Sequence, residues 1–216
     1  MRKHFLEELE NLKKSILAMG DMAINSVNIA VLSLVQRDEK KAREVINGDD
    51  KLDEMEMKIE KDCISLIALQ QPIAEDLRII AAGLKIITDL ERIGDRAVDI
   101  AEIVLEVADR PHVKPLIDIP RMSELAQEMI KDSLIAFAAN DVKLAESLGK
   151  RDDLVDALND QVRRELMEII IEDPRKLADA TRLMFVASYL ERIADHSTNI
   201  GERVIYMVEG RRVKIN

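Results

Sequence analysis

The sequence predicts an all-α fold with six helices in two tandem sets of three. Apolar residues recur with helical spacing along most of the 216 residues. Aromatic residues make up only 2% of the chain, and there are seven glycines and five prolines. This composition argues against a β sandwich or barrel, which needs aromatic strands and frequent turns. The two halves also share sequence motifs, which indicates a tandem duplication of a three-helix unit.

The first helix is expected to run from about Phe5 to the segment at residues 36–38. A single apolar stripe follows it in alternating steps of four and three residues, with one step skipped. The stripe consists of Phe5, Leu9, Leu12, Ile16, Met19, Ala23, Ala30 and Leu34. One face of this helix is therefore expected to be buried.

A second helical stretch is expected from about Asp38 to Gln71, with a kink or break at Gly48. Pro72 can open the third helix in its first turn, where a missing N–H costs nothing. This third helix is expected to continue to about Asp109.

Three of the five prolines fall within residues 111–120, and no helix is expected to survive that spacing. This segment is interpreted as a linker between a first three-helix repeat, residues 1–110, and a second, residues 121–216. The pattern of the first repeat then starts again.

In the second repeat a helix is expected from about Arg121 to a break near residues 140–141. A further helix should reach about Glu172, and Pro174 should open the last one. The six helices therefore form two sets of three.

Charge and composition restrict the function. The chain has 32 basic and 42 acidic residues, a formal charge of −10, which argues against nucleic acid as a main partner. The longest uncharged run, residues 22–36, is shorter than the ~18 apolar residues that a membrane span needs. The N-terminus lacks an apolar signal core, and the single Cys63 cannot form an internal disulfide. We expect a soluble cytoplasmic protein.

The internal repeat is the most informative feature of the sequence. DLERIGDRAVDIAE at residues 89–102 aligns with YLERIADHSTNIGE at residues 189–202, with seven of 14 positions identical. Upstream, the offset is 103 residues instead of 100. The upstream matches pair Asp38, Lys40, Ala42, Asp49, Asp50 and Asp53 with Asp141, Lys143, Ala145, Asp152, Asp153 and Asp156.

Acidic residues dominate the repeated positions. At ~100° per residue, Glu91, Asp95, Asp99 and Glu102 share a stripe about 80° wide on the third helix. Asp49, Asp53, Glu56 and Glu60 lie within roughly 60° on the second helix. The second repeat keeps Glu191, Asp195 and Glu202, and it has Asn199 in place of Asp99.

The stripe continues a line that is apolar one to two turns earlier, at Leu77 and Leu84, so the acids are expected to face the bundle or its edge. Clustered carboxylates in such a place need protons or compensating cations. A hard metal ion neutralises several oxygen ligands at once, and we favour this interpretation over a solvated acidic face.

At these residues the chain resembles the PhoU family of phosphate-signalling regulators. The resemblance rests on LERIGD at 90–95 and LERIAD at 190–195, supported by QQPIAEDLR at 70–78 and DHSTNIGE at 195–202. It covers essentially the whole chain. It implies two three-helix bundles related by pseudo-twofold symmetry, each with a multinuclear metal site that faces the surface.

The resemblance also implies the ligands. Glu91 and Asp95 correspond to Glu191 and Asp195, and the same spacing at Asp49/Asp53 and Asp152/Asp156 supplies the facing ligands. Asp99 and Asn199 are expected as further ligands, with Glu102, Glu202 and Glu56 as additional ones. Iron, zinc, manganese or magnesium would be bound. Glu56 and Glu60 become Asn159 and Arg163 in the second repeat, so the two sites differ in charge.

The function that the resemblance implies is regulatory. Such a protein is an adaptor between the phosphate ABC transporter, through its ATPase, and a sensor histidine kinase. It represses the phosphate-starvation response, is expected to form a homodimer, and reaches the membrane only through its partners. No catalytic Ser/His/Asp set, glycine-rich phosphate loop or CxxC pair is present, so enzymatic activity is not expected.

Two alternatives stay open. A carboxylate-bridged di-iron or ferritin-like protein shares helices and carboxylates but normally uses Glu-x-x-His pairs. Asp109 and Ile193 stand three residues before His112 and His196, so neither histidine forms such a pair. The other alternative is a structural helical scaffold whose acidic residues are solvated.

Overall fold

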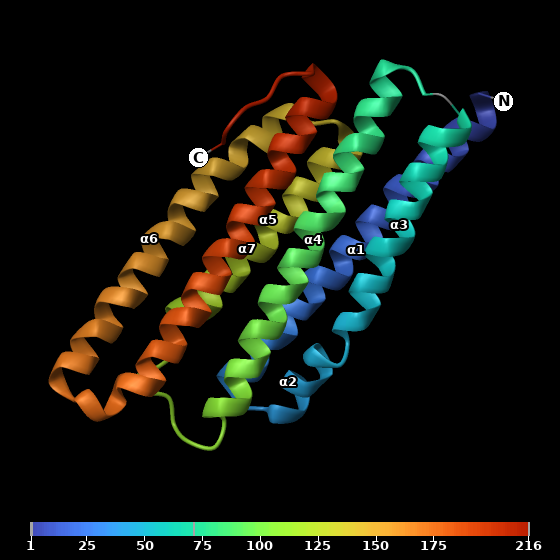
Figure 1. Ribbon diagram of the computed structural model, residues 1–216. Helices are drawn as coiled ribbons and strands as arrows, with labels where there is room; N and C mark the ends of the chain where they lie inside the picture. The colour runs from blue at the N-terminus through green and yellow to red at the C-terminus, as the bar shows by residue number, and fades with distance from the viewer. Residues whose placement is uncertain (1, 71, 216) are drawn as a thin grey trace.

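The structure is a computed structural model that describes residues 2–70 and 72–215 (Figure 1). These residues form helices and no strands, which confirms the predicted all-α fold. The helices are α1 (Arg2–Gln36), α2 (Glu39–Ile46), α3 (Asp49–Gln70), α4 (Ala74–Val107), α5 (Asp118–Ala139), α6 (Val142–Glu172), the 3₁₀ helix η1 (Pro174–Lys176) and α7 (Leu177–Glu209).

The long helices form two layers. In Figure 1 the front layer is a row in the order α6, α7, α4 and α3, and α5 and α1 lie behind it. Helix α5 packs against α6 and α7, helix α1 packs against α3 and α4, and the two back helices contact each other. Each three-helix set therefore contributes two front helices and one back helix.

The predicted apolar stripe of α1 is buried over its whole length. The step skipped in the sequence pattern is filled by Val27, which is also buried. By length and composition alone, Lys3–Gln36 could cross a membrane, because an 18-residue window within it has a mean hydropathy of 1.5. The core helix of a water-soluble bundle has the same properties, and α1 packs against α3, α4 and α5.

The second helical stretch is divided where the sequence predicted. Helix α2 ends at Ile46 and α3 begins at Asp49, with Gly48 in the break. Asp38 is the N-cap of α2, and its carboxylate accepts the N–H groups of Lys40 and Lys41. The predicted end of the stretch, Gln71, lies outside the described residues.

Two proline positions differ from the prediction. Pro72 is outside α4, which begins at Ala74, because Ile73 between them is extended (φ −70°, ψ 166°). Helix α5 begins at Asp118, three residues before Arg121, so Pro120 lies inside it. This proline is tolerated because N–H groups in a first helical turn have no intrahelical partner. The non-helical linker therefore spans residues 108–117, three residues earlier than the predicted 111–120.

The second set follows the prediction more closely. Helix α5 ends with Asn140 in the left-handed conformation (φ 55°), which reverses the chain, and Asp141 is the N-cap of α6. Helix α6 ends at Glu172 as expected. Pro174 opens a 3₁₀ turn that leads directly into α7.

Helices α4 and α7 run antiparallel at the centre of the front layer. The Arg78 Nε group near the start of α4 donates to the Met207 carbonyl near the end of α7, at 3.1 Å. At the other end, Arg110, just after α4, pairs with Asp179 at the start of α7, with an N–O distance of 2.7 Å. The buried apolar residues of both halves form one continuous core around these helices.

The C-terminal segment after α7 folds back over α6 and α7. The N–H group of Ile215 donates to the Glu202 carboxylate at 3.1 Å. A Cβ atom on Gly149 would lie 3.0 Å from the Ile215 side chain, and a Cβ atom on Gly201 would lie 3.1 Å from it. These two glycines therefore permit the close approach of the segment.

Candidate functional site

The first acidic cluster lies between α3 and α4, and consists of Asp49, Asp53, Glu91 and Asp95. All four side chains are partly buried. Burial and the charges of Asp95, Glu56 and Asp53, in that order, raise the pKa of Glu91 to about 6. Burial, Asp53 and Asp95 likewise raise the pKa of Asp49. The two helices thus bring together the carboxylates that the sequence placed on two facing stripes.

The close approach of α3 to α4 has a local cause at Gly94. A Cβ atom there would lie 2.3 Å from Leu52 Cδ2 and 3.8 Å from Asp49 Oδ1. Real Cβ atoms do not come that close to a neighbour, so glycine is what allows Leu52 to pack at this point. The repeat equivalent is Ala194, which is buried. The α3–α4 pair therefore has a glycine at its acidic cluster where the α6–α7 pair has an alanine.

The second acidic cluster lies between α6 and α7, and consists of Asp152, Asp156, Glu191 and Asp195. Asp152 is only 1% exposed. Its pKa is raised to about 7, first by burial and then by the charges of Asp156 and Asp195. Burial also raises the pKa of Asp195, while Lys214 in the C-terminal segment acts in the opposite direction. Raised pKa values of neighbouring carboxylates indicate that burial and mutual repulsion outweigh the favourable charges nearby.

The donors in both clusters are oxygen atoms alone, which suits hard cations such as magnesium, manganese or iron better than soft ones. Across residues 2–70 and 72–215, no three Asp, Glu, His or Cys side chains lie close enough together to hold one ion in their present rotamers. Like charges repel, so a bound cation would have to draw the carboxylates together by side-chain rotation.

The further ligands that the sequence suggested on α4 and α7 have other contacts. Asp99 accepts a hydrogen bond from Arg96 Nη1 at 2.5 Å, and Arg192 of α7 also lowers its pKa, although burial raises it overall. Asn199 Nδ2 donates to Asp89 Oδ1 at 3.4 Å. Asp99 and Asn199 therefore lie toward the junction of α4 and α7.

The additional candidates Glu56, Glu102 and Glu202 also differ in position. Glu56 Oε1 accepts the Thr88 hydroxyl at 3.1 Å, beside the first cluster. Glu102 lines an open pocket between α4 and α7. Glu202 accepts the Ile215 N–H group. The structure thus places each of the three in a different setting.

The sequence did not reveal the polar contacts between α4 and α7. His196 Nδ1 of α7 lies 3.0 Å from Asp89 Oδ1 of α4. The Arg96 guanidinium carbon lies 5.7 Å from the centroid of the Tyr189 ring. Asp89/Tyr189 and Arg96/His196 are repeat equivalents. That alignment could have drawn attention to them, but it does not give the antiparallel register.

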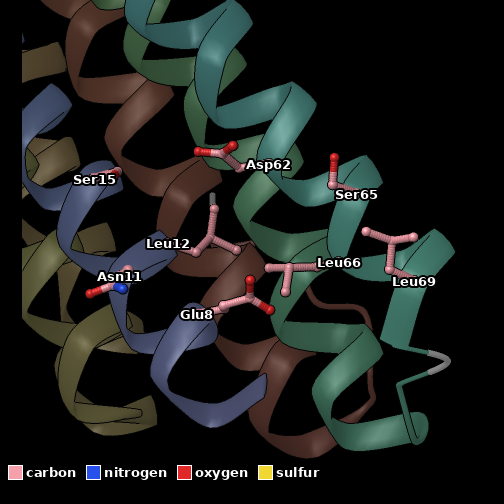
Figure 2. Close-up of a pocket in the computed structure, with 8 residues that line it drawn as sticks. All are labelled: Glu8, Asn11, Leu12, Ser15, Asp62, Ser65, Leu66 and Leu69. Carbon is pink, nitrogen blue, oxygen red and sulfur yellow. The ribbon is translucent and has the colours of Figure 1, made fainter. Parts of the chain in front are cut away.

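A pocket of about 240 Å³ lies between α1 and α3, away from both clusters (Figure 2). Its walls combine polar and apolar side chains: Glu8, Asn11, Leu12, Ser15, Asp62, Ser65, Leu66 and Leu69. None of them was among the site residues predicted from the sequence.

Comparison with known proteins gives consistent matches. The PhoU domain family matches the chain over residues 16–104 and 119–204. The phosphate-specific transport system accessory protein PhoU homolog of Clostridium acetobutylicum is 42% identical over 216 residues, which is 100% of this chain and 99% of that protein. The homolog of Aquifex aeolicus is 44% identical over 208 residues, covering 96% of this chain and 94% of that protein.

Solved structures agree with these matches. The crystal structure of PhoU from Pseudomonas aeruginosa superposes with a TM-score of 0.91 at 36% identity, covering 96% of this chain and all of that chain. The phosphate transport system regulatory protein PhoU from Streptococcus pneumoniae superposes with a TM-score of 0.90 at 29% identity, covering 97% and 99%.

Proposed function

The chain belongs to the PhoU family of phosphate-transport accessory proteins, and from this premise we propose that it couples phosphate uptake to phosphate signalling. It acts as an adaptor that contacts the ATPase of the phosphate ABC transporter and a sensor histidine kinase. When phosphate is plentiful, it holds the phosphate-starvation response in the repressed state. The observation that carries this proposal is the full-length match to proteins named as accessory to phosphate-specific transport.

We further propose that the protein works in the cytoplasm as a homodimer and without catalysing a reaction. The relatives' names describe accessory and regulatory proteins, which supports a role in binding. A cytoplasmic adaptor would reach the membrane only through its two partners.

Deletion of the gene tests the adaptor. We expect a phosphate-starvation reporter to become active in phosphate-rich medium, because the kinase is no longer restrained. Expression of the intact chain from a plasmid should restore repression. A reporter that stays repressed in the deletion strain would rule the adaptor out.

We propose in addition that each acidic cluster binds hard metal ions. Asp49, Asp53, Glu91 and Asp95 are the ligands in the first half. Asp152, Asp156, Glu191 and Asp195 are the ligands in the second half. The full or partial burial of all these carboxylates except the exposed Asp156, and the raised pKa values of Glu91 and Asp152, support the proposal, because a cation would remove their mutual repulsion.

When bound, a metal ion would supply positive charge and a fixed geometry at these helix pairs. Asp99, Asn199, Glu56, Glu102 and Glu202 are proposed as the outer ligands of these sites. Because ligands must be deprotonated to bind metal, affinity should weaken below about pH 6 at the first cluster, near the pKa of Glu91, and below about pH 7 at the second, near the pKa of Asp152.

Elemental analysis of protein purified without chelator tests the metal sites. We expect at least one tightly held ion per cluster, and its loss in the Glu91→Ala/Glu191→Ala double variant. The control variant Glu10→Ala/Glu124→Ala removes two exposed acids from α1 and α5 and should retain the metal. Protein that is purified without metal and does not bind added metal at micromolar concentration would exclude the sites while leaving the adaptor intact.

A further inference from the structure

An open groove of about 440 Å³ lies between α4 and α7, toward the end of the front layer where α4 ends and α7 begins. Its walls include Asp99, Glu102 and Glu106 of α4 and Arg182, Phe185 and Tyr189 of α7. It is separate from the α3–α4 and α6–α7 junctions that hold the two acidic clusters. Asp99 and Glu102 are also among the proposed outer metal ligands, so a metal ion at the first cluster and an occupant of this groove would compete for them.

The floor of this groove carries two of the five Phe and Tyr residues of the chain. The rings of Phe185 and Tyr189 stack with their centroids 6.4 Å apart and an angle of 21° between their planes. Phe185 is 52% exposed, which leaves much of its ring in contact with water. A large exposed aromatic side chain in a hollow is typical of a binding hot spot.

The Tyr189 ring is already in contact with a guanidinium group of this chain. Arg96 lies over the Tyr189 ring at 5.7 Å from the ring centroid. Arginine stacks on aromatic faces because its flat cation is attracted by the ring electrons and is weakly hydrated. The exposed ring of Phe185 offers a second surface of the same kind.

The charges around the groove favour a cationic occupant. Three carboxylates and one arginine line it, and Arg182 is engaged by Glu106 and Asp179. Asp99 is paired with Arg96. Glu102 is exposed beside the aromatic pair, where it can receive an incoming guanidinium group.

The aromatic pair of this groove is present in only one of the two repeats. The repeat equivalents of Phe185 and Tyr189 are Lys85 and Asp89, so the corresponding surface has a cation where this groove has an exposed ring. Duplication alone therefore does not account for the aromatic pair.

We propose that this groove is the docking surface for an arginine-bearing segment of a protein partner, an inference that rests on the proposed adaptor function. The partner's guanidinium group stacks on Phe185 and pairs with Glu102, and the apolar part of its segment contacts the rings. A second copy of this chain is a poorer match, because its net charge is −10 and the groove is itself acidic.

Binding measurements with purified proteins test the proposal. The full-length chain, and variants whose metal content matches the wild type by elemental analysis, are titrated with the transporter ATPase and with the cytoplasmic region of the kinase from the same organism. We expect Phe185→Ala to weaken binding of one of them about 10-fold or more, and Glu102→Gln to weaken it less and to reduce its salt dependence. Met167→Ala, also 52% exposed but on α6, and Glu124→Gln on α5 are the matched controls and should bind as the wild type does.

Photo-crosslinking identifies the occupant. With p-benzoylphenylalanine in place of Phe185, we expect a crosslink to a segment of the same partner that contains arginine. A crosslink to a segment without arginine, or to a second copy of this chain, would overturn the proposal. So would Phe185→Ala binding with wild-type affinity while the wild-type chain binds a partner. If the wild-type chain binds neither partner, the adaptor function itself fails, and the docking proposal fails with it.

Discussion

Asp152 shows at the scale of one residue what the acidic clusters cost the fold. It is buried, and the carboxylates of Asp156 and Asp195 lie near it, so its folded-state pKa is about 7 against an ordinary value of 3.8. The folded protein therefore binds this proton more tightly than the unfolded chain does. Without metal, the stability contributed by protonated Asp152 is complete below about pH 4 and is lost as the pH rises to about 7.

Replacing the carboxyl group of Asp152 by an amide should remove this loss of stability at neutral and higher pH. In metal-free buffer, we expect Asp152→Asn to raise the free energy of unfolding by about 1 to 3 kcal/mol at pH 8, and to have little effect near pH 4. Urea denaturation followed by circular dichroism at the two pH values measures the difference. The neighbour Asp153 is exposed, so Asp153→Asn should change stability little at either pH. A gain of equal size at both pH values would show that the charge of Asp152 is not the cause.

The sequence was informative about residues whose environment depends on one or two neighbouring helices. Helical angles placed Asp49 and Asp53 on one stripe and Glu91 and Asp95 on another. The resemblance implied that the two stripes face each other, and the structure brings them together. The contacts of Asp99, Asn199 and Glu202 could not be predicted in this way. Asn199 and Glu202 have partners in distant segments, Asp89 and Ile215, and Asp99 is influenced by Arg192 of α7 besides its local partner Arg96. Such pairs depend on the register between helices, which no local pattern encodes.

At the scale of the helix, periodicity predicted the elements well and their ends less well. The apolar stripe of α1 is buried throughout, because a long period-3.6 pattern leaves few alternatives. Proline gave weaker information, since it is tolerated both before a helix and inside its first turn. Pro72 lies before α4, and Pro120 lies inside the first turn of α5. The residue type alone does not distinguish them.

The repeat alignment paired Asp38 with Asp141, and the structure gives both the same task as helix N-caps. Asp38 accepts two N–H groups at the start of α2, and Asp141 accepts the N–H group of Leu144 at the start of α6. We expect Asp38→Ala and Asp141→Ala each to lower the free energy of unfolding by about 1 kcal/mol, because these N–H groups lose their partner.

Substitution by asparagine provides the control for the caps, since asparagine caps helices as well as aspartate does. Asp38→Asn and Asp141→Asn should therefore stay close to the wild type in urea denaturation. If the asparagine variants lose as much stability as the alanine variants, the negative charge and not the cap is responsible.

At the scale of the whole molecule, the two halves share one core. Buried residues from both sets of helices form a continuous cluster, and α4 and α7 lie in contact at its centre. The sequence predicted two repeats, but it could not show how closely they join. The residues that join them, such as Arg110 and Asp179, lie outside the aligned motifs.

We therefore expect both halves to unfold in a single transition. The two tyrosines, Tyr189 and Tyr206, both lie in α7, so their fluorescence reports on the second half, whereas circular dichroism reports on all helices. The two probes should give the same urea midpoint. Two separated transitions would show that the halves are energetically independent.

The order of helices in the front layer sets how the two acidic clusters influence each other. One cluster lies between α3 and α4 and the other between α7 and α6, so two helix spacings of about 10 Å each separate them, roughly 20 Å in all. At physiological ionic strength, charges are screened over about 8 Å. Ion binding at one cluster should therefore have little effect on the metal affinity of the other. Metal titration should fit two independent classes of site with Hill coefficients near one.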